Sequence, residues 1–181
     1  LSVMNGFDRE LRDRILTVVP QIQVIHNSGV ERWQEQVSVI SAHPRVSEVT
    51  PFNELNGLVN FRRDSRPVQL LGLSAEAMPS GIASLLEKSG AGLPGRGQVL
   101  LSRVIASDLN VQPGQRVTIV VPDISGPTTA VSLEVSGLFS THTEVDQLLA
   151  ITSLAQVADM AALPGLVKGF RVQVDDQFNA R

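Results

Sequence analysis

Apolar residues in the first eighteen positions recur at helical spacing. Five side chains three or four residues apart form one stripe: Met4, Phe7, Leu11, Ile15 and Val18. Two acid-before-base pairs with a spacing of four residues support an exposed helix over the same stretch. The pattern therefore predicts an amphipathic helix that ends before Pro20.

The rest of the chain alternates between strand-like and helix-like patterns. A short strand is predicted at Ile22–Ile25, followed by a helix that Ser28 and Glu31 would cap and that runs to about Ala42. Further helices are expected near Ile82–Lys88, after Ser102, and from Ser153 to about Leu163. Further strands are expected at Val46–Phe52, Glu54–Phe61, Pro67–Leu71, Gln98–Leu101, Arg116–Val121, Val131–Phe139, Leu148–Ile151 and Phe170–Val174. This order lacks the regular βαβ rhythm of a doubly wound sheet and indicates an α+β fold.

Composition narrows the possible partners. The chain has 181 residues, 43% of them hydrophobic and 18% charged, which is ordinary for one large domain or two small lobes. A net charge of −3 gives no reason to expect nucleic acid or anionic lipid as a partner. The chain has no Cys, which excludes disulfides and thiol chemistry. No stretch reaches the roughly 18 apolar residues that a membrane span needs.

Two segments suggest chemistry, and both have a simpler explanation. Gly90–Gly95 matches the spacing of a dinucleotide-binding loop, but Pro94 interrupts it and a strand follows where that site needs a helix. Thr141–Asp146 places His142 near two carboxylates that could hold a metal. No second ligand cluster is visible, so a solvated loop is favoured. We expect no catalytic residue, no cofactor and no metal.

The opening residues carry a resemblance. Leu1-Ser-Val-Met-Asn-Gly-Phe7, with Glu10-Leu11, Arg14-Ile-Leu16 and Pro20, resembles the segment after the first membrane span of the LolC/LolE family of lipoprotein-releasing permeases. A pattern of apolar positions and glycines extends the resemblance over nearly the whole chain. It implies a fragment between two transmembrane helices, at the periplasmic face of the inner membrane of a Gram-negative bacterium.

The resemblance also implies an architecture. Periplasmic domains of this family, like those of the macrolide exporter MacB, have two lobes. Residues 1–45 and 98–181 would form a mixed α/β lobe next to the membrane helices. Residues 46–97 would form an inserted, mostly-β lobe.

The function implied is lipoprotein release, without enzymatic activity in this chain. A LolC-like permease subunit and the ATPase LolD would be partners, a triacylated lipoprotein the substrate, and LolA the carrier that receives it. Pro122–Thr128 is too short for the hook with which LolC-type subunits grip LolA, so the chain resembles LolE and its contact with LolA would be weak or indirect. The alternatives are a MacB-like exporter or cell-division permease, a ligand- or peptide-binding module and, more distantly, a small hydrolase.

The resemblance also marks candidate substrate contacts at the outer end of the first membrane helix. These residues, which would lie near the bound lipoprotein, are Val3, Met4, Phe7 and Leu11. In the alternative interpretation, the same stripe packs the first helix onto the domain. Periodicity is equally compatible with both.

Overall fold

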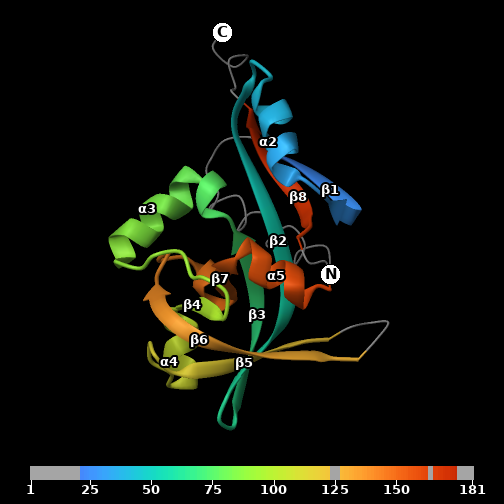
Figure 1. Cartoon of the computed structure of the whole chain (residues 1–181). Coiled ribbons are helices and arrows are strands. Elements are labelled where there is room, and N and C mark those ends of the chain that lie inside the picture. The colour runs from blue at the N-terminus through green and yellow to red at the C-terminus, as the bar shows by residue number, and fades with distance from the viewer. Residues whose placement is uncertain (1–20, 123–126, 163–164, 175–181) are drawn as a thin grey trace, which may run out of the picture.

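The computed structural model describes residues 21–122, 127–162 and 165–174, which form strands and short helices in mixed order (Figure 1). The strands are β1 (Gln21–Val30), β2 (Val46–Phe61), β3 (Asp64–Leu73), β4 (Gln98–Ser102), β5 (Arg116–Val121), β6 (Thr129–Phe139), β7 (Leu149–Ser153) and β8 (Val167–Val174). The helices are α2 (Trp33–Ser41), α3 (Ser80–Ser89), α4 (Arg103–Leu109) and α5 (Leu154–Met160), with 3-10 turns η1 (Ala75–Ala77) and η2 (Glu144–Gln147).

Six of the strands close into a barrel. Their order is β2-β3-β7-β4-β6-β5, and β5 pairs again with β2 through Leu58 opposite Val120 and Asn60 opposite Thr118. Apolar side chains from all six fill the interior, among them Val59, Leu70, Val99, Ile119, Leu133 and Ala150. Because the barrel is closed, each of these six strands has a paired neighbour on both sides, and none is left as an edge strand.

A smaller sheet extends from the barrel. The first part of β2, Val46–Phe52, pairs with β8, and β8 pairs on its other side with β1. Helix α2 covers one face of this sheet, where Trp33, Val37 and Ile40 pack on the cluster around Phe170. Figure 1 shows β2 running through both parts of the molecule.

The two strands predicted at Val46–Phe52 and Glu54–Phe61 are one continuous strand of 16 residues. Asn53, between them, does not interrupt it, because it pairs with Gly72 of β3 and continues the ladder. Pro51 is tolerated where β2 has β8 as its neighbour and the pairing with β3 has not yet begun. Within the strand predicted at Glu54–Phe61, burial alternates, since Val59 and Phe61 are buried and Asn56 is exposed.

Helix starts were predicted correctly where a serine caps them. The hydroxyl of Ser102 accepts the N–H of Ile105, and that of Ser153 accepts the N–H of Gln156. The cap predicted at Ser28 and Glu31 is wrong. Pairing of Val30 with Val167 extends β1 to that point, and α2 begins at Trp33, after Arg32 in a left-handed conformation (φ 49°).

The fold class predicted from the sequence, α+β, is confirmed. The lobe boundaries at 46 and 97 stay a prediction. Strands β2 and β3 of that segment pair with β8, β5 and β7, which belong to the remainder of the chain.

Candidate functional site

The two ends of the described chain lie at the same end of the molecule. Gln21, the first residue of β1, pairs with Gln173 of β8, and Val174 pairs with Val46 at the start of β2. The hairpin that joins β2 to β3 lies at the opposite end (Figure 1). Chain segments that precede Gln21 and follow Val174 therefore join the domain side by side.

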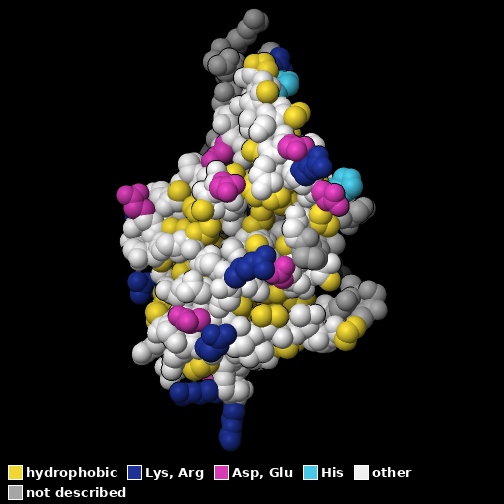
Figure 2. Space-filling view, viewed as in Figure 1, with side chains coloured by type: hydrophobic (Ala, Val, Ile, Leu, Met, Phe, Trp, Pro, Cys, Tyr) yellow, Lys and Arg dark blue, Asp and Glu magenta, His cyan; other side chains and the backbone are white. Residues whose placement is uncertain are grey.

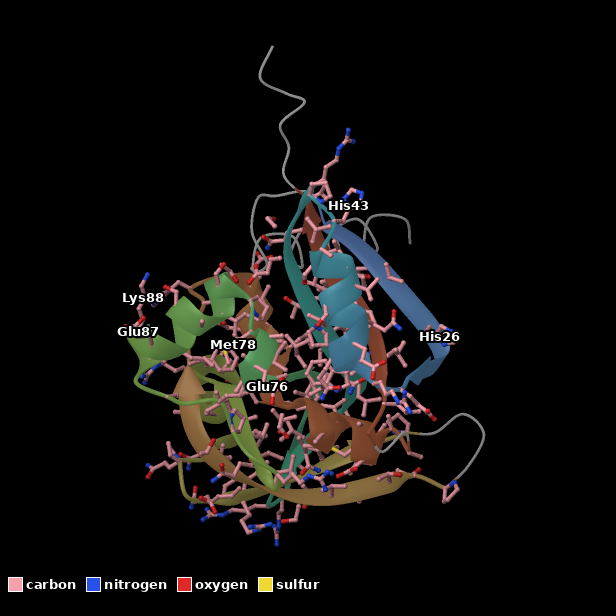
Figure 3. The ribbon with its side chains drawn as sticks, turned by 45° about the horizontal axis from the view of Figure 1, so that its top comes forward. His26, His43, Glu76, Met78, Glu87 and Lys88 are labelled. Atoms are coloured by element: carbon pink, nitrogen blue, oxygen red, sulfur yellow. The ribbon has the colours of Figure 1, made fainter. Side chains whose placement is uncertain are left out.

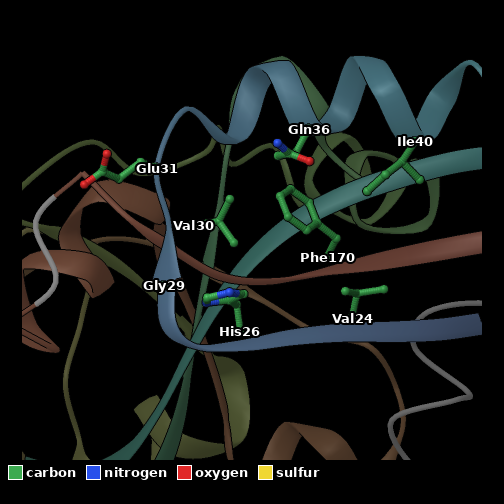
Figure 4. Close-up of a pocket in the computed structure, with 8 residues that line it drawn as sticks. All are labelled: Val24, His26, Gly29, Val30, Glu31, Gln36, Ile40 and Phe170. Carbon is green, nitrogen blue, oxygen red and sulfur yellow. The ribbon is translucent and has the colours of Figure 1, made fainter.

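An apolar groove lies near this end, between α2 and the edge of the small sheet. Figure 4 shows its lining, which we call the α2–β1 groove: Val24, His26, Gly29, Val30, Glu31, Gln36, Ile40 and Phe170. Its volume is ≈ 430 Å³. It exists because α2 packs over β2 and β8 and leaves the adjoining β1 uncovered.

Strand β1 exposes two large apolar side chains to solvent. Val24 is 48% exposed and Ile25 is 54% exposed, and they point to opposite faces because side chains alternate along a strand. Val24 lies opposite Phe170 in the pairing with β8 and lines the groove with it. Such a surface can bind an apolar group by burial.

A second groove, also of ≈ 430 Å³, lies between the start of α2, the glycine-rich loop and α5. Its apolar lining includes Trp33, Leu73, Leu93, Pro94, Leu154, Ala158 and Leu166. Neither groove brings together a nucleophile, a base and a third orienting group. Their chemistry is suited to binding or packing.

The loop Gly90–Gly95 lacks the surroundings of a dinucleotide site. It follows α3 and leads into β4, whereas that site needs a strand before it and a helix after it. Gly90 ends α3 in a left-handed conformation, and the N–H of Ala91 donates to the carbonyl of Leu86. The loop ends a helix, and the strand predicted after it is confirmed as β4.

The carboxylate of Asp146 is used within its own loop. It is 3% exposed and accepts hydrogen bonds from the N–H and hydroxyl of Thr141 and from the hydroxyl of Ser140. The predicted solvated loop is confirmed for His142–Glu144, which are exposed, but Asp146 is buried as the acceptor that holds the turn.

The other histidines form no metal site with these residues. Figure 3 shows His26 on β1 and His43 beyond the far end of α2. Within residues 21–122, 127–162 and 165–174, no three His, Asp or Glu side chains are grouped to hold a metal ion.

The predicted substrate-contact residues, Val3, Met4, Phe7 and Leu11, lie outside the described residues, and their assignment stays a prediction. Sequence reasoning missed the α2–β1 groove. The available signal was the Val24-Ile25 pair, two adjacent apolar residues in a strand that cannot both face one core.

Known proteins similar to this chain are permeases. LolE of Haemophilus influenzae, a transmembrane protein of a lipoprotein-releasing system, is 27% identical over 100% of this chain and 47% of its own length. LolC of Xylella fastidiosa is 28% identical over 99% of this chain and 46% of its own, and LolC of Neisseria meningitidis has the same values. The chain is homologous to the LolC and LolE permeases. It spans about half the length of these relatives, and no family model matches it.

Solved structures confirm the predicted fold type. The extracellular domain of the ABC-type transporter YknZ from Gram-positive bacteria superposes with a TM-score of 0.57 at 11% identity, covering 87% of this chain and 85% of that one. The periplasmic region of MacB from Actinobacillus actinomycetemcomitans gives 0.52 at 13% identity, covering 92% and 79%. The homologue of LolC and LolE therefore has the fold of MacB-like periplasmic domains. Within its described part, no helix is long and apolar enough to cross a membrane.

Proposed function

We propose that this chain is the periplasmic domain of a permease subunit that releases lipoproteins from the inner membrane of a Gram-negative bacterium. The observation that carries the proposal is the similarity to LolE and LolC over 99–100% of the chain. The position of the two chain ends supports it. A domain inserted between two membrane helices needs an entrance and an exit on the same side, and Gln21 and Gln173 are paired neighbours.

The domain would act as a rigid body and not as a catalyst. ATP would be hydrolysed by a LolD-type partner on the other side of the membrane, and movement would reach this domain through the flanking helices. The first and last described strands, β1 and β8, both belong to the small sheet, and β2 continues from this sheet into the closed barrel. A displacement at the ends is thereby passed to the barrel through a paired strand.

We further propose a LolE-type subunit. Strand β5 ends at Val121 and β6 begins at Thr129, so the link between them is short, whereas a LolC-type hook needs a long one. Identities of 27% to LolE and 28% to LolC do not separate the two types, so the short link carries this assignment. Contact with a LolA-type carrier would accordingly be weak or indirect.

Reconstitution tests the proposed function. The full-length permease that contains this chain, its partner permease and the ATPase are placed in lipid vesicles with a triacylated lipoprotein. We expect ATP-dependent release of the lipoprotein to a soluble carrier, and no release when the ATPase carries a substituted phosphate-loop lysine. An intact, ATP-hydrolysing complex that releases no lipoprotein would contradict the proposal.

The MacB-like fold supports a second candidate, an exporter of small hydrophobic compounds. The same vesicles distinguish the two. ATP-dependent transport of a macrolide with no effect on lipoprotein would favour the exporter.

A further inference from the structure

The hairpin between β2 and β3 ends in two arginines, Arg62 and Arg63, which we call the arginine tip. Phe61 pairs with Asp64, so these two residues alone make the turn. Both are exposed, and neither forms an ion pair with another described residue. Figure 2 shows Lys and Arg side chains projecting from the end of the molecule where Figure 1 places this hairpin. Two unpaired positive charges therefore stand side by side on a protein whose net charge is −3.

The backbone at the tip favours a different residue. Arg62 has a φ of 56°, in the left-handed region. Two-residue hairpin turns place Gly, Asn or Asp at such positions, because a larger side chain is strained there. Because glycine or asparagine would adopt this conformation with less strain, the presence of arginine indicates a role for its side chain.

The base of the tip is held firmly. The guanidinium of Arg62 lies 5.0 Å from the centre of the Phe61 ring, and the hydroxyl of Ser65 donates to Asn60 at 2.6 Å. Arg66 forms an ion pair with Asp108 of α4 and donates to the side-chain and main-chain oxygens of Gln147 at 3.1 Å. The charge of Arg66 is thus neutralised by Asp108, and Arg66 fixes the base of the hairpin. Arg62 and Arg63 remain exposed to solvent in an ordered turn.

The tip lies far from the chain ends. Strand β2 runs from Val46, beside Val174, to Phe61, and sixteen residues at about 3.3 Å each span about 50 Å. In the orientation of the proposed function, lipid headgroups face the chain ends, and the tip is many Debye lengths from them. An anionic membrane surface is therefore out of reach, which leaves a protein surface as the source of negative charge.

We propose that the arginine tip docks a carboxylate-rich surface of a protein partner that stands on the side of this domain remote from the membrane. Arginine forms paired hydrogen bonds with carboxylates, and exposed charge pairs of this kind accelerate association and set its register. The proposal relies on the proposed function only for the orientation of the domain. It adds a contact site and the chemistry of the partner.

Charge reversal in the full-length permease tests the proposal. Cells whose sole copy carries R62E and R63E are compared with wild type by pulse-labelling a lipoprotein and measuring its release from the inner membrane. We expect release to slow by about tenfold, as for loss of electrostatic steering. The variant R62K/R63K, which keeps the charge but cannot form the paired hydrogen bonds, should slow release less than R62E/R63E does. Lys88→Glu, an exposed reversal on α3 (Figure 3), should have no effect.

Two further results separate docking from folding. Arg62→Gly combined with Arg63→Asn relieves the strained turn, so it should raise the melting temperature of the permease domain while release still slows. Suppressors of R62E/R63E should replace Asp or Glu by Lys or Arg on the surface of a different polypeptide. Release at the wild-type rate in R62E/R63E or in R62G/R63N, or suppressors confined to this chain, would overturn the proposal. Absence of ATP-dependent release in wild type would instead refute the proposed function.

Discussion

Single residues hold the small sheet to the barrel, and Asn53 is central among them. It is 4% exposed, and its amide nitrogen donates to the carbonyls of Leu154 and Leu166 at 3.1 and 3.2 Å. Its amide oxygen accepts the N–H of Lys168 at 2.8 Å. One side chain thus joins β2, α5 and β8, and pairs three backbone groups at buried or partly buried positions.

We expect Asn53→Ala to lower the free energy of unfolding by about 2–4 kcal/mol, because it leaves buried backbone groups unpaired. Chemical denaturation of the purified domain measures the change. Asn56→Ala, at an exposed position of the same strand, is the matched control and should change stability by less than about 0.5 kcal/mol. Equal decreases in the free energy of unfolding of the two variants would show that the hydrogen bonds of Asn53 are not the cause.

Gly57 marks the point where the barrel closes. A Cβ at this position would lie 2.6 Å from the carbonyl oxygen of Val120, in the stretch where β2 pairs with β5. Gly57→Ala should therefore destabilise the domain by about 1–3 kcal/mol, since backbone must move to admit the methyl group. Gly92→Ala is the control, because nothing lies within 4 Å of a Cβ there. Thermal unfolding that ranks Gly92→Ala as the more harmful change would contradict the closed geometry.

At the scale of elements, two short helices depend on their serine caps. Ser102 accepts the N–H of Ile105 at 3.2 Å and also donates to the carbonyl of Asp146 at 2.5 Å, both in the interior. Ser102→Ala should cost about 2 kcal/mol, and Ser153→Ala, which removes a cap alone, about 1 kcal/mol. Ser107→Ala on the exposed side of α4 should be nearly neutral. The three unfolding curves together measure this order, and a neutral Ser102→Ala would refute it.

The elements that could be predicted from sequence are those whose signals are local. The helix starts at Ser102 and Ser153 and the strand at Val131–Phe139 need no knowledge of distant residues, and the structure confirms them. Arg32 as the start of α2 and the union of two predicted strands in β2 depend on pairing with β8 and β3. For the α2–β1 groove, the adjacent apolar residues Val24 and Ile25 were a partial signal, because they cannot both face one core. The position of the groove could not be predicted, because it depends on where α2 stops covering the sheet, and that is set by tertiary packing.

At the scale of the whole molecule, the predicted contacts at Met4 and Phe7 can be tested against their packing alternative. We expect Met4→Asp or Phe7→Asp in the full permease to impair lipoprotein release more than it lowers the melting temperature of the domain. An aspartate there would place a charge beside acyl chains, which is costly unless it is paired.

The control for this comparison is Asn5→Asp, which adds the same charge off the apolar stripe and should leave release intact. In the packing alternative, the fragment itself would lose about 2–5 kcal/mol of stability. Normal release together with a strongly lowered melting temperature would exclude substrate contact at these positions.

The pairing of β1 with β8 has a consequence for how the chain is made. β1 has no other described partner, and 137 residues separate Val30 from its partner Val167. At about 5–20 residues per second, a ribosome needs roughly 7–30 seconds to cover that distance. During this interval the first described strand has been synthesised while the strand it pairs with has not. In this incomplete chain β1 lacks its pairing partner, and its apolar residues Val24 and Ile25 are accessible. An unpaired, apolar strand can associate with other chains. We therefore expect the nascent domain to bind a chaperone that prevents aggregation until β8 is made.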